Sequence, residues 1–163
     1  MKADVKPRAR SAAQDMSKQR LRLWLRLLRA TRAIERELRE RLRVKFGITL
    51  PQFDVMAALY RRENGMTMTE LSRMLLVSNG NVTGIIDRLV NDGLVARVPS
   101  ADDRRAIMVR LTPKGSARFA AIARAHQDWI DEILADIDGE EADVIIRHLD
   151  GLPARISNGG VRS

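Results

Sequence analysis

The sequence predicts a mainly α-helical fold with one small β-hairpin. Apolar residues recur at helical spacing near both ends of the chain. In the middle, two short helices with their own capping residues are followed directly by two segments rich in β-branched residues. The 163 residues are enough for one domain of ordinary size.

The first helix is predicted from Lys18 to Phe46. This stretch contains neither Pro nor Gly, and its leucines and Trp24 recur at helical spacing, so one face should be apolar. Gly47 is expected to end the helix. Residues 1–17 are basic and lack hydrophobic periodicity, and we expect a flexible arm there.

Capping residues predict where the next two helices begin. Thr49 can cap a second helix that has Pro51 in its first turn. Thr67 and Glu70 have the spacing of a capping box, in which each side chain bonds the backbone N–H of the other residue. A third helix should therefore run from Met68 to Leu76.

A fourth helix should begin at Ser78, which can cap it, and end near Asn91, with Gly93 placed for a left-handed C-cap. Only a brief turn separates the third and fourth helices, so the pair forms a helix-turn-helix. Leu94–Val98 and Ala106–Leu111 then predict a hairpin with a long polar tip. A hairpin at this place is the wing of a winged helix-turn-helix.

Two helices are predicted after the hairpin. Thr112–Pro113 begins one of them, and its apolar residues form a stripe. Asp138 and Glu141 form a capping box at the start of the other, which should end near Ile156. Residues 157–163 are expected to be disordered.

The composition narrows the classes of function. The chain has 29 Lys and Arg against 21 Asp and Glu, and the net charge of +8 favours anionic partners such as nucleic acid. It has no cysteine and only His126 and His148, so we expect no metal and no cofactor. Neither a secretory signal nor a membrane-spanning run is visible, and we expect a cytoplasmic protein with no membrane partner.

An enzyme is not expected. The two histidines lie in the predicted terminal helices without a convincing catalytic partner, and the glycines match no phosphate-binding pattern. The acidic residues are scattered along the chain. These absences favour a binding protein.

The fourth helix has one apolar face and one face with short side chains. The residues expected to be buried are Val82, Ile85, Ile86 and Leu89. Gly80 and Gly84 then face outward, and each costs about 1 kcal/mol of helix propensity relative to Ala. Close approach of the helix to a DNA groove would offset that loss.

The first turns of this helix hold the residues that we expect to read DNA. They are Ser78, Asn79, Asn81 and Thr83. A recognition helix presents such side chains to base edges in the major groove. In the alternative interpretation Ser78 is only a helix cap and the asparagines are only solvated polar residues.

The tip of the hairpin contains two adjacent arginines, Arg104 and Arg105, whose side chains point to opposite faces of an extended strand. One of them can enter the minor groove of DNA, while the other pairs with an acid such as Asp87 or Asp103 and fixes the wing. The alternative is a solvated, charged turn.

The segment from Thr67 to Gly115 resembles the MarR family. It contains VSNGNVTGIIDRLVNDGLVARVPSADDRRAIMVRLTPKG, in which a helix-turn-helix is followed by the pattern xDDRRxxxVxLTPKG, and weaker similarity extends over residues 21–152. The resemblance implies a homodimer. Its terminal helices, residues 18–48 and 113–156, would form a dimerisation region, and residues 49–112 would form a winged helix-turn-helix.

The resemblance also implies functional roles. Two winged modules would read a palindromic operator in double-stranded DNA, with half-sites about one helical turn apart. Asn79, Asn81, Thr83 and Arg88 match recognition-helix positions, and Arg104 or Arg105 matches the wing position that enters the minor groove. Family members often repress a nearby operon until a small aromatic acid or an oxidant releases them. Because this chain lacks cysteine, it departs from the thiol-sensing branch, which favours a ligand as the trigger.

A stripe of arginines on the first helix suggests what such a ligand could be. Its members are Arg22, Arg29, Arg36 and Arg43, with Arg26, Arg32 and Arg39 beside them. The hypothesis is an anionic aromatic effector, an aromatic acid or a CoA thioester, anchored by Arg29 and Arg36. Trp24, Phe53 and Met56 are candidate walls of its site. Alternatively, the stripe is a solvated face, and these three residues belong to the core.

A second class of function is also compatible with the sequence. A sequence-independent architectural DNA-binding protein would suit the basic arm and the two outward glycines. Such a protein would show little preference for any operator and a steep dependence on salt.

Overall fold

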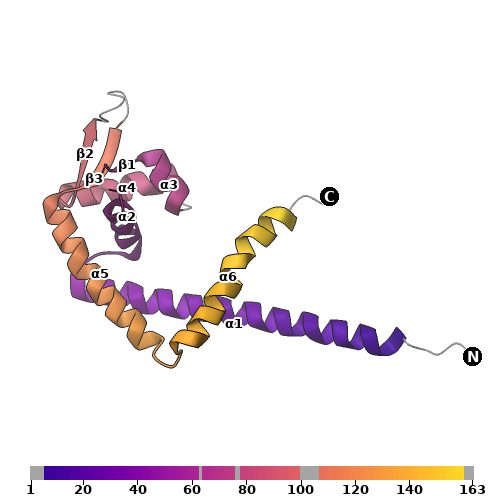
Figure 1. The fold of residues 1–163 in the computed structure, drawn as a ribbon. Coiled ribbons are helices and arrows are strands. Elements are labelled where there is room, and N and C mark those ends of the chain that lie inside the picture. Colours follow the sequence, from indigo (N-terminus) through magenta and orange to yellow (C-terminus); the bar gives the residue numbers. More distant parts are fainter. Residues whose placement is uncertain (1–5, 63, 76–77, 100–106, 160–163) are drawn as a thin grey trace, which may run out of the picture. The chain divides into compact units, whose positions relative to one another are not determined.

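The computed structural model describes residues 6–62, 64–75, 78–99 and 107–159. The chain divides into two compact units, residues 1–125 and 126–163. The predicted mainly α-helical fold with a small hairpin is confirmed (Figure 1). The helices are α1 (Lys6–Phe46), α2 (Leu50–Tyr60), α3 (Met68–Leu75), α4 (Asn79–Asn91), α5 (Pro113–Ile133) and α6 (Gly139–Gly159), and the strands are β1 (Met66–Thr67), β2 (Val95–Pro99) and β3 (Ile107–Leu111).

Helix α1 begins earlier than predicted. It starts at Lys6 rather than Lys18, so residues 6–17, which we expected to be a flexible arm, are helical. Pro7 occupies the first turn, where proline is tolerated, and no Pro or Gly follows within the helix. The predicted start was wrong because it required an apolar stripe. This segment contains mostly Ala, Arg and other good helix formers instead, and residues 14–20 are exposed.

Two capping boxes start α2 and α3. Thr49 Oγ1 accepts a hydrogen bond from the Gln52 backbone N–H at 3.3 Å, and Gln52 Oε1 accepts one from the Thr49 N–H at 2.8 Å. Only the Thr49 cap was predicted. The predicted box of Thr67 and Glu70 is confirmed, with nitrogen to oxygen distances of 2.7 and 3.2 Å. The hydrogen bonds from the Thr67 backbone and hydroxyl lower the pKa of Glu70.

The sheet has a third strand that the sequence analysis missed. The antiparallel order is β1-β3-β2, with Met66 opposite Val109 and Val95 opposite Leu111. Strand β1 is two residues long, too short for any periodicity to reveal it. Pairing with β3 links the segment before α3 to the hairpin, and the buried side chain of Met66 anchors this segment in the core.

The hydrophobic core lies in the first unit. Helices α2, α3 and α4 gather beside the sheet at one end of α1 (Figure 1). Phe119 of α5 closes the core, because its ring packs against Tyr60 and Phe53 with centroids 4.9 and 5.6 Å apart. The largest fully buried side chains are Leu42, Val55, Met56, Leu59, Leu71, Val82, Ile86, Leu89, Val109 and Ile122.

The C-terminal end of α4 is fixed to the start of α5, and we call this contact the α4–α5 junction (residues 92–94 and 112–115). Gly93 has a φ of 70°, the left-handed conformation predicted for it. Thr112 Oγ1 donates to the Gly93 carbonyl at 2.8 Å, and Lys114 Nζ donates to the Asp92 carbonyl at 2.9 Å. A Cβ on Gly115 would overlap the Leu94 carbonyl. The LTPKG motif therefore holds α5 directly against the backbone that leaves α4.

The second unit contains α6. Its predicted capping box is confirmed, since the Glu141 N–H donates to Asp138 Oδ1 at 2.9 Å and the Asp138 N–H donates to Glu141 Oε2 at 3.4 Å. The helix ends at Gly159 rather than Ile156, so residues 157–159, which we expected to be disordered, are helical. Neither Ser157 nor Asn158 breaks the helix before the first glycine of the Gly-Gly pair. Within the described residues, no helix is long and apolar enough to cross a membrane.

We expect Gly115→Ala to destabilise the protein by about 1–3 kcal/mol, because the added methyl group has to displace the backbone at Leu94. Urea denaturation measures this change. Gly84→Ala is the matched control. Gly84 is helical and exposed with open space around it, so the substitution should stabilise the protein by up to about 1 kcal/mol. Equal stability of Gly115→Ala and wild type would show that the α4–α5 junction is loose.

Candidate nucleic-acid interface

The start of α4 is built as predicted. Ser78 Oγ accepts a hydrogen bond from the Asn81 backbone N–H at 3.4 Å, which confirms Ser78 as the N-cap. Asn79 is the first residue of the helix. Because Ser78 and Asn81 are both exposed, the N-terminal turn of α4 is open to an approaching molecule. A contact between Ser78 and DNA stays a prediction.

The outward face of α4 is exposed and bears few long side chains. Asn81, Thr83 and Arg88 are exposed on it. Gly80 and Gly84 are exposed as well. Apart from the adjacent residues and the backbone of α4 itself, no atom of the described residues lies within 4 Å of the place where a Cβ would stand on either glycine. Nothing in the described fold therefore requires glycine at these two positions, although both weaken the helix.

The inward face of α4 matches the sequence pattern. Val82, Ile86 and Leu89 are completely buried, and Ile85 is half-buried. This packing sets the rotation of the helix, so the exposed face described above is fixed relative to the core.

An ion pair joins α4 to the hairpin. Arg97 Nη2 of β2 donates to Asp87 Oδ1 of α4 at 2.6 Å, and both side chains are partly exposed. Asp87 was expected to fix the wing, with Arg104 or Arg105 as its partner. Those arginines and Asp103 lie outside the described residues.

Arg97 was not predicted as the partner of Asp87, because the sequence indicated only that it lies in a strand. The two residues are ten apart in the sequence, and only the packing of β2 beside α4 brings them together. Strand alternation, which makes Arg97 an outward residue of β2, was the available signal.

The candidate effector residues differ in how far they are exposed. Phe53 and Met56 belong to the core, with 9% and 0% of their surfaces exposed, and the Phe53 ring packs on Phe119. They lie in the core, as the alternative interpretation has it, and their role as walls of a ligand site stays a prediction. The apolar spacing on α2 reflects burial against α5 and the rest of the core. Trp24, by contrast, is 57% exposed.

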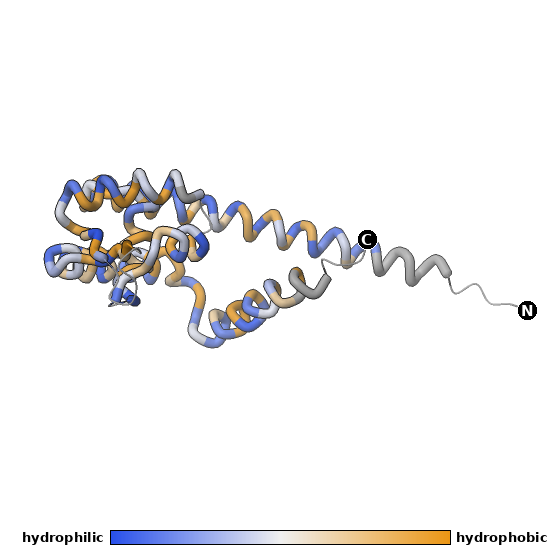
Figure 2. Tube along the Cα trace, turned by 90° about the horizontal axis from the view of Figure 1, so that it is seen from above, coloured by the Kyte–Doolittle hydropathy of each residue, from blue (hydrophilic) through white to orange (hydrophobic). Residues whose placement is uncertain are grey.

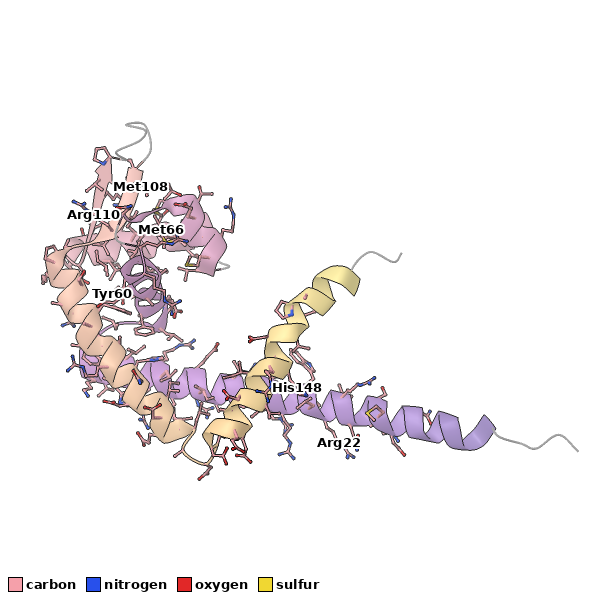
Figure 3. All side chains as sticks on the ribbon, in the orientation of Figure 1. Arg22, Tyr60, Met66, Met108, Arg110 and His148 are labelled. Atoms are coloured by element: carbon pink, nitrogen blue, oxygen red, sulfur yellow. The ribbon has the colours of Figure 1, made fainter. Side chains whose placement is uncertain are left out.

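The arginine stripe of α1 is exposed and partly neutralised. Arg29 and Arg36 are exposed, as expected for anchors of an anionic ligand. Arg43 pairs with Glu40 at 2.6 Å, and this hydrogen bond lowers the pKa of the Glu40 carboxyl. Arg22, which extends from α1 in Figure 3, lines a hollow of about 250 Å³ together with other residues of the stripe. The remaining lining residues are Leu25, Arg26 and Arg29.

A metal centre finds no support in the described part of the chain. It contains no group of three or more His, Cys, Asp or Glu side chains that could hold an ion.

Known proteins resemble this arrangement closely. The model of the MarR family matches residues 46–106, from the last residue of α1 to the residue before β3. The crystal structure of a MarR family transcriptional regulator from Silicibacter pomeroyi is 30% identical with a TM-score of 0.73, and the match covers 87% of this chain and 98% of that one. The chain belongs to the MarR family.

The names of two further relatives state what those proteins do. A mutant MarR from E. coli, crystallised in complex with operator DNA, is 28% identical with a TM-score of 0.70, and the match covers 82% of this chain and 95% of that one. The transcriptional activatory protein BadR of Rhodopseudomonas palustris is 38% identical over 109 residues, which are 65% of this chain and 57% of BadR. This MarR-family protein is therefore a transcriptional regulator with a winged helix-turn-helix.

The ion pair between α4 and the hairpin of this MarR-family protein should contribute little to stability. A double-mutant cycle with Asp87→Ala and Arg97→Ala should give a coupling of about 0.2–1 kcal/mol in urea denaturation, because both groups are partly exposed. The exchanged pair Asp87→Arg with Arg97→Asp should recover part of that coupling. Arg110→Ala, on the neighbouring strand, is the control and should not couple to Asp87→Ala. Additive single effects would mean that the two groups do not interact in solution.

Proposed function

We propose that this protein binds a palindromic operator in double-stranded DNA as a homodimer and represses transcription until a small anionic aromatic ligand releases it. The observation that carries this proposal is the outward face of α4. It is exposed and contains two glycines that the fold itself does not require.

The proposal places α4 in the major groove. Ser78, Asn79, Asn81 and Thr83 lie in the first turns of α4 or just before it, from which a recognition helix reaches base edges. Gly80 and Gly84 let the helix backbone approach the DNA closely, because a glycine has no side chain that would separate the backbone from the DNA. Arg88 lies about one turn beyond Gly84 and contacts a phosphate.

The hairpin supplies the wing. Strand β2 ends at Pro99 and β3 begins at Ile107. The proposal places the tip of the wing in the segment between them, which contains Arg104 and Arg105. One of these arginines enters the minor groove. The ion pair of Asp87 with Arg97 supports this role, because it links the hairpin to the helix that reads the major groove.

Exposed apolar residues support the homodimer. Hydrophobic residues recur along the backbone of α1 and of α6 (Figure 2). On α6 those that are exposed are Val144, Ile145, Ile146, Leu149, Leu152 and Ile156, and on α1 they include Leu21, Trp24 and Leu25. Exposed apolar residues of this kind, taken on each helix by itself, are normally covered by a partner. A second copy of residues 18–48 and 113–156 would cover them and place two winged modules on one operator.

Selection of bound duplexes from a random DNA pool tests sequence-specific binding. A palindromic consensus is the expected result. Asn81→Ala should then relax the preference at one base pair by about 1–3 kcal/mol, because the side chain that reads a base edge is removed. Asn91→Ala, in the last turn of the same helix, is the matched control and should keep the consensus.

Two outcomes would contradict the proposal. Equal losses for Asn81→Ala on operator and random DNA would exclude a reading role for this residue. A pool without any consensus would favour a sequence-independent architectural protein instead. BadR is named an activatory protein, so a reporter assay with and without the regulator measures the sign of regulation separately.

Titration of the operator complex with aromatic acids and their CoA thioesters tests the effector. At least one compound should raise the dissociation constant of the DNA, and Arg29→Ala should weaken the response because Arg29 lines the hollow on α1. Arg20→Ala, on the same helix but outside that hollow, is the control. The ligand hypothesis fails if no compound in the panel weakens DNA binding.

A further inference from the structure

A groove runs beside the recognition helix and is lined by three different helices. It has a volume of about 590 Å³. Arg39 of α1 lies on one side, Thr49 and Pro51 at the start of α2 lie next to it, and Gly84 and Arg88 of α4 lie on the other side. Arg39, which belongs to the arginine stripe of α1, therefore lines the same groove as residues of α4, the helix proposed to read DNA.

The groove has the charge of a phosphate site. Its lining residues include two guanidinium groups and no carboxylate. The neighbours of Arg39 on α1 are neutralised, since Arg41 pairs with Glu37 at 2.7 Å and Arg43 pairs with Glu40 at 2.6 Å. Among the described residues, neither Arg39 nor Arg88 has an acidic partner, and both are exposed.

The position of the groove relative to α4 fits one edge of a major groove. Gly80, Gly84 and Arg88 are four residues apart and form one row along the helix, and this row borders the groove. Asp87, one residue before Arg88, faces the hairpin instead, where it pairs with Arg97. A helix in the major groove has a sugar-phosphate strand along each flank. On α4, the groove borders the row of Gly80, Gly84 and Arg88, and the hairpin lies on the side of Asp87.

We infer that Arg39 and Arg88 bind the phosphodiester backbone of one DNA strand in this groove. The inference rests on the proposed DNA binding and adds a residue, Arg39, that lies on α1 outside the winged module. A guanidinium fork suits phosphate oxygens, and the open space above Gly80 and Gly84 lets the strand approach the floor of the groove. The contact is with phosphate, so it adds affinity and register without reading sequence.

Salt titrations of DNA binding by the full-length protein test this inference. Arg39→Ala should weaken binding to the selected operator and to a random duplex by the same factor. The slope of log K against log salt concentration should become shallower by about 0.9 for each phosphate that is no longer neutralised, or about 1.8 for a dimer in which both copies of Arg39 are replaced. Arg39→Lys keeps the charge and should retain most of the slope.

The matched control is Arg32→Ala. Arg32 is exposed on α1, seven residues before Arg39, and does not line the groove. This variant should bind DNA like the wild type. A second measurement uses operators with neutral methylphosphonate linkages at single positions: one replacement should weaken the wild type and leave Arg39→Ala unchanged.

The outcomes separate this inference from the proposed function. If Arg39→Ala keeps the wild-type affinity and salt slope, or loses affinity for the operator alone, the phosphate contact is disproved while operator binding stands. If the wild type shows no preference for any sequence but Arg39→Ala still lowers the salt slope, operator recognition fails and the phosphate contact is supported. Thermal melting of both alanine variants confirms that they are folded.

Discussion

The candidate DNA-binding surface depends on the burial of one face of α4. Val82, Ile86 and Leu89 are completely buried, and each such side chain contributes about 1.5–3 kcal/mol. The two glycines on the opposite face cost about 1 kcal/mol each in helix propensity. Burial therefore outweighs the loss, and α4 remains helical with an outward face that is almost bare. Without this packing, the glycines would end or fray the helix.

The surroundings of α4 hold it by contacts of different strength. Backbone carbonyls at its C-terminal end accept hydrogen bonds at the α4–α5 junction, and the close approach of Gly115 to Leu94 leaves little freedom there. The ion pair of Asp87 with Arg97 is partly exposed and adds at most about 1 kcal/mol, so it orients the hairpin more than it stabilises the fold. The contacts at the α4–α5 junction therefore hold α4 more firmly than the ion pair of Asp87 with Arg97 holds the hairpin.

Local signals in the sequence were sufficient for most of the secondary structure. The caps at Thr49, Thr67, Ser78 and Asp138 were all predicted, because a capping side chain bonds a backbone group only three residues away. Two features escaped this kind of reasoning. Strand β1 has no periodicity of its own and forms because β3 provides its hydrogen-bond partners. The first turns of α1 lack an apolar stripe and are helical through backbone propensity.

The sequence by itself determined the order of the helices and of the two hairpin strands, the buried and exposed faces of α4, and the resemblance that led to the MarR family. It determined them because capping, periodicity and motif spacing act over a few residues. Tertiary structure alone decided which distant side chains meet. It paired Asp87 with Arg97, buried Phe53 and Met56, and placed Arg39 beside α4. These outcomes depend on how helices and strands pack against one another. Packing brings together residues that are far apart in the sequence, and no local pattern of residues indicates that they will meet.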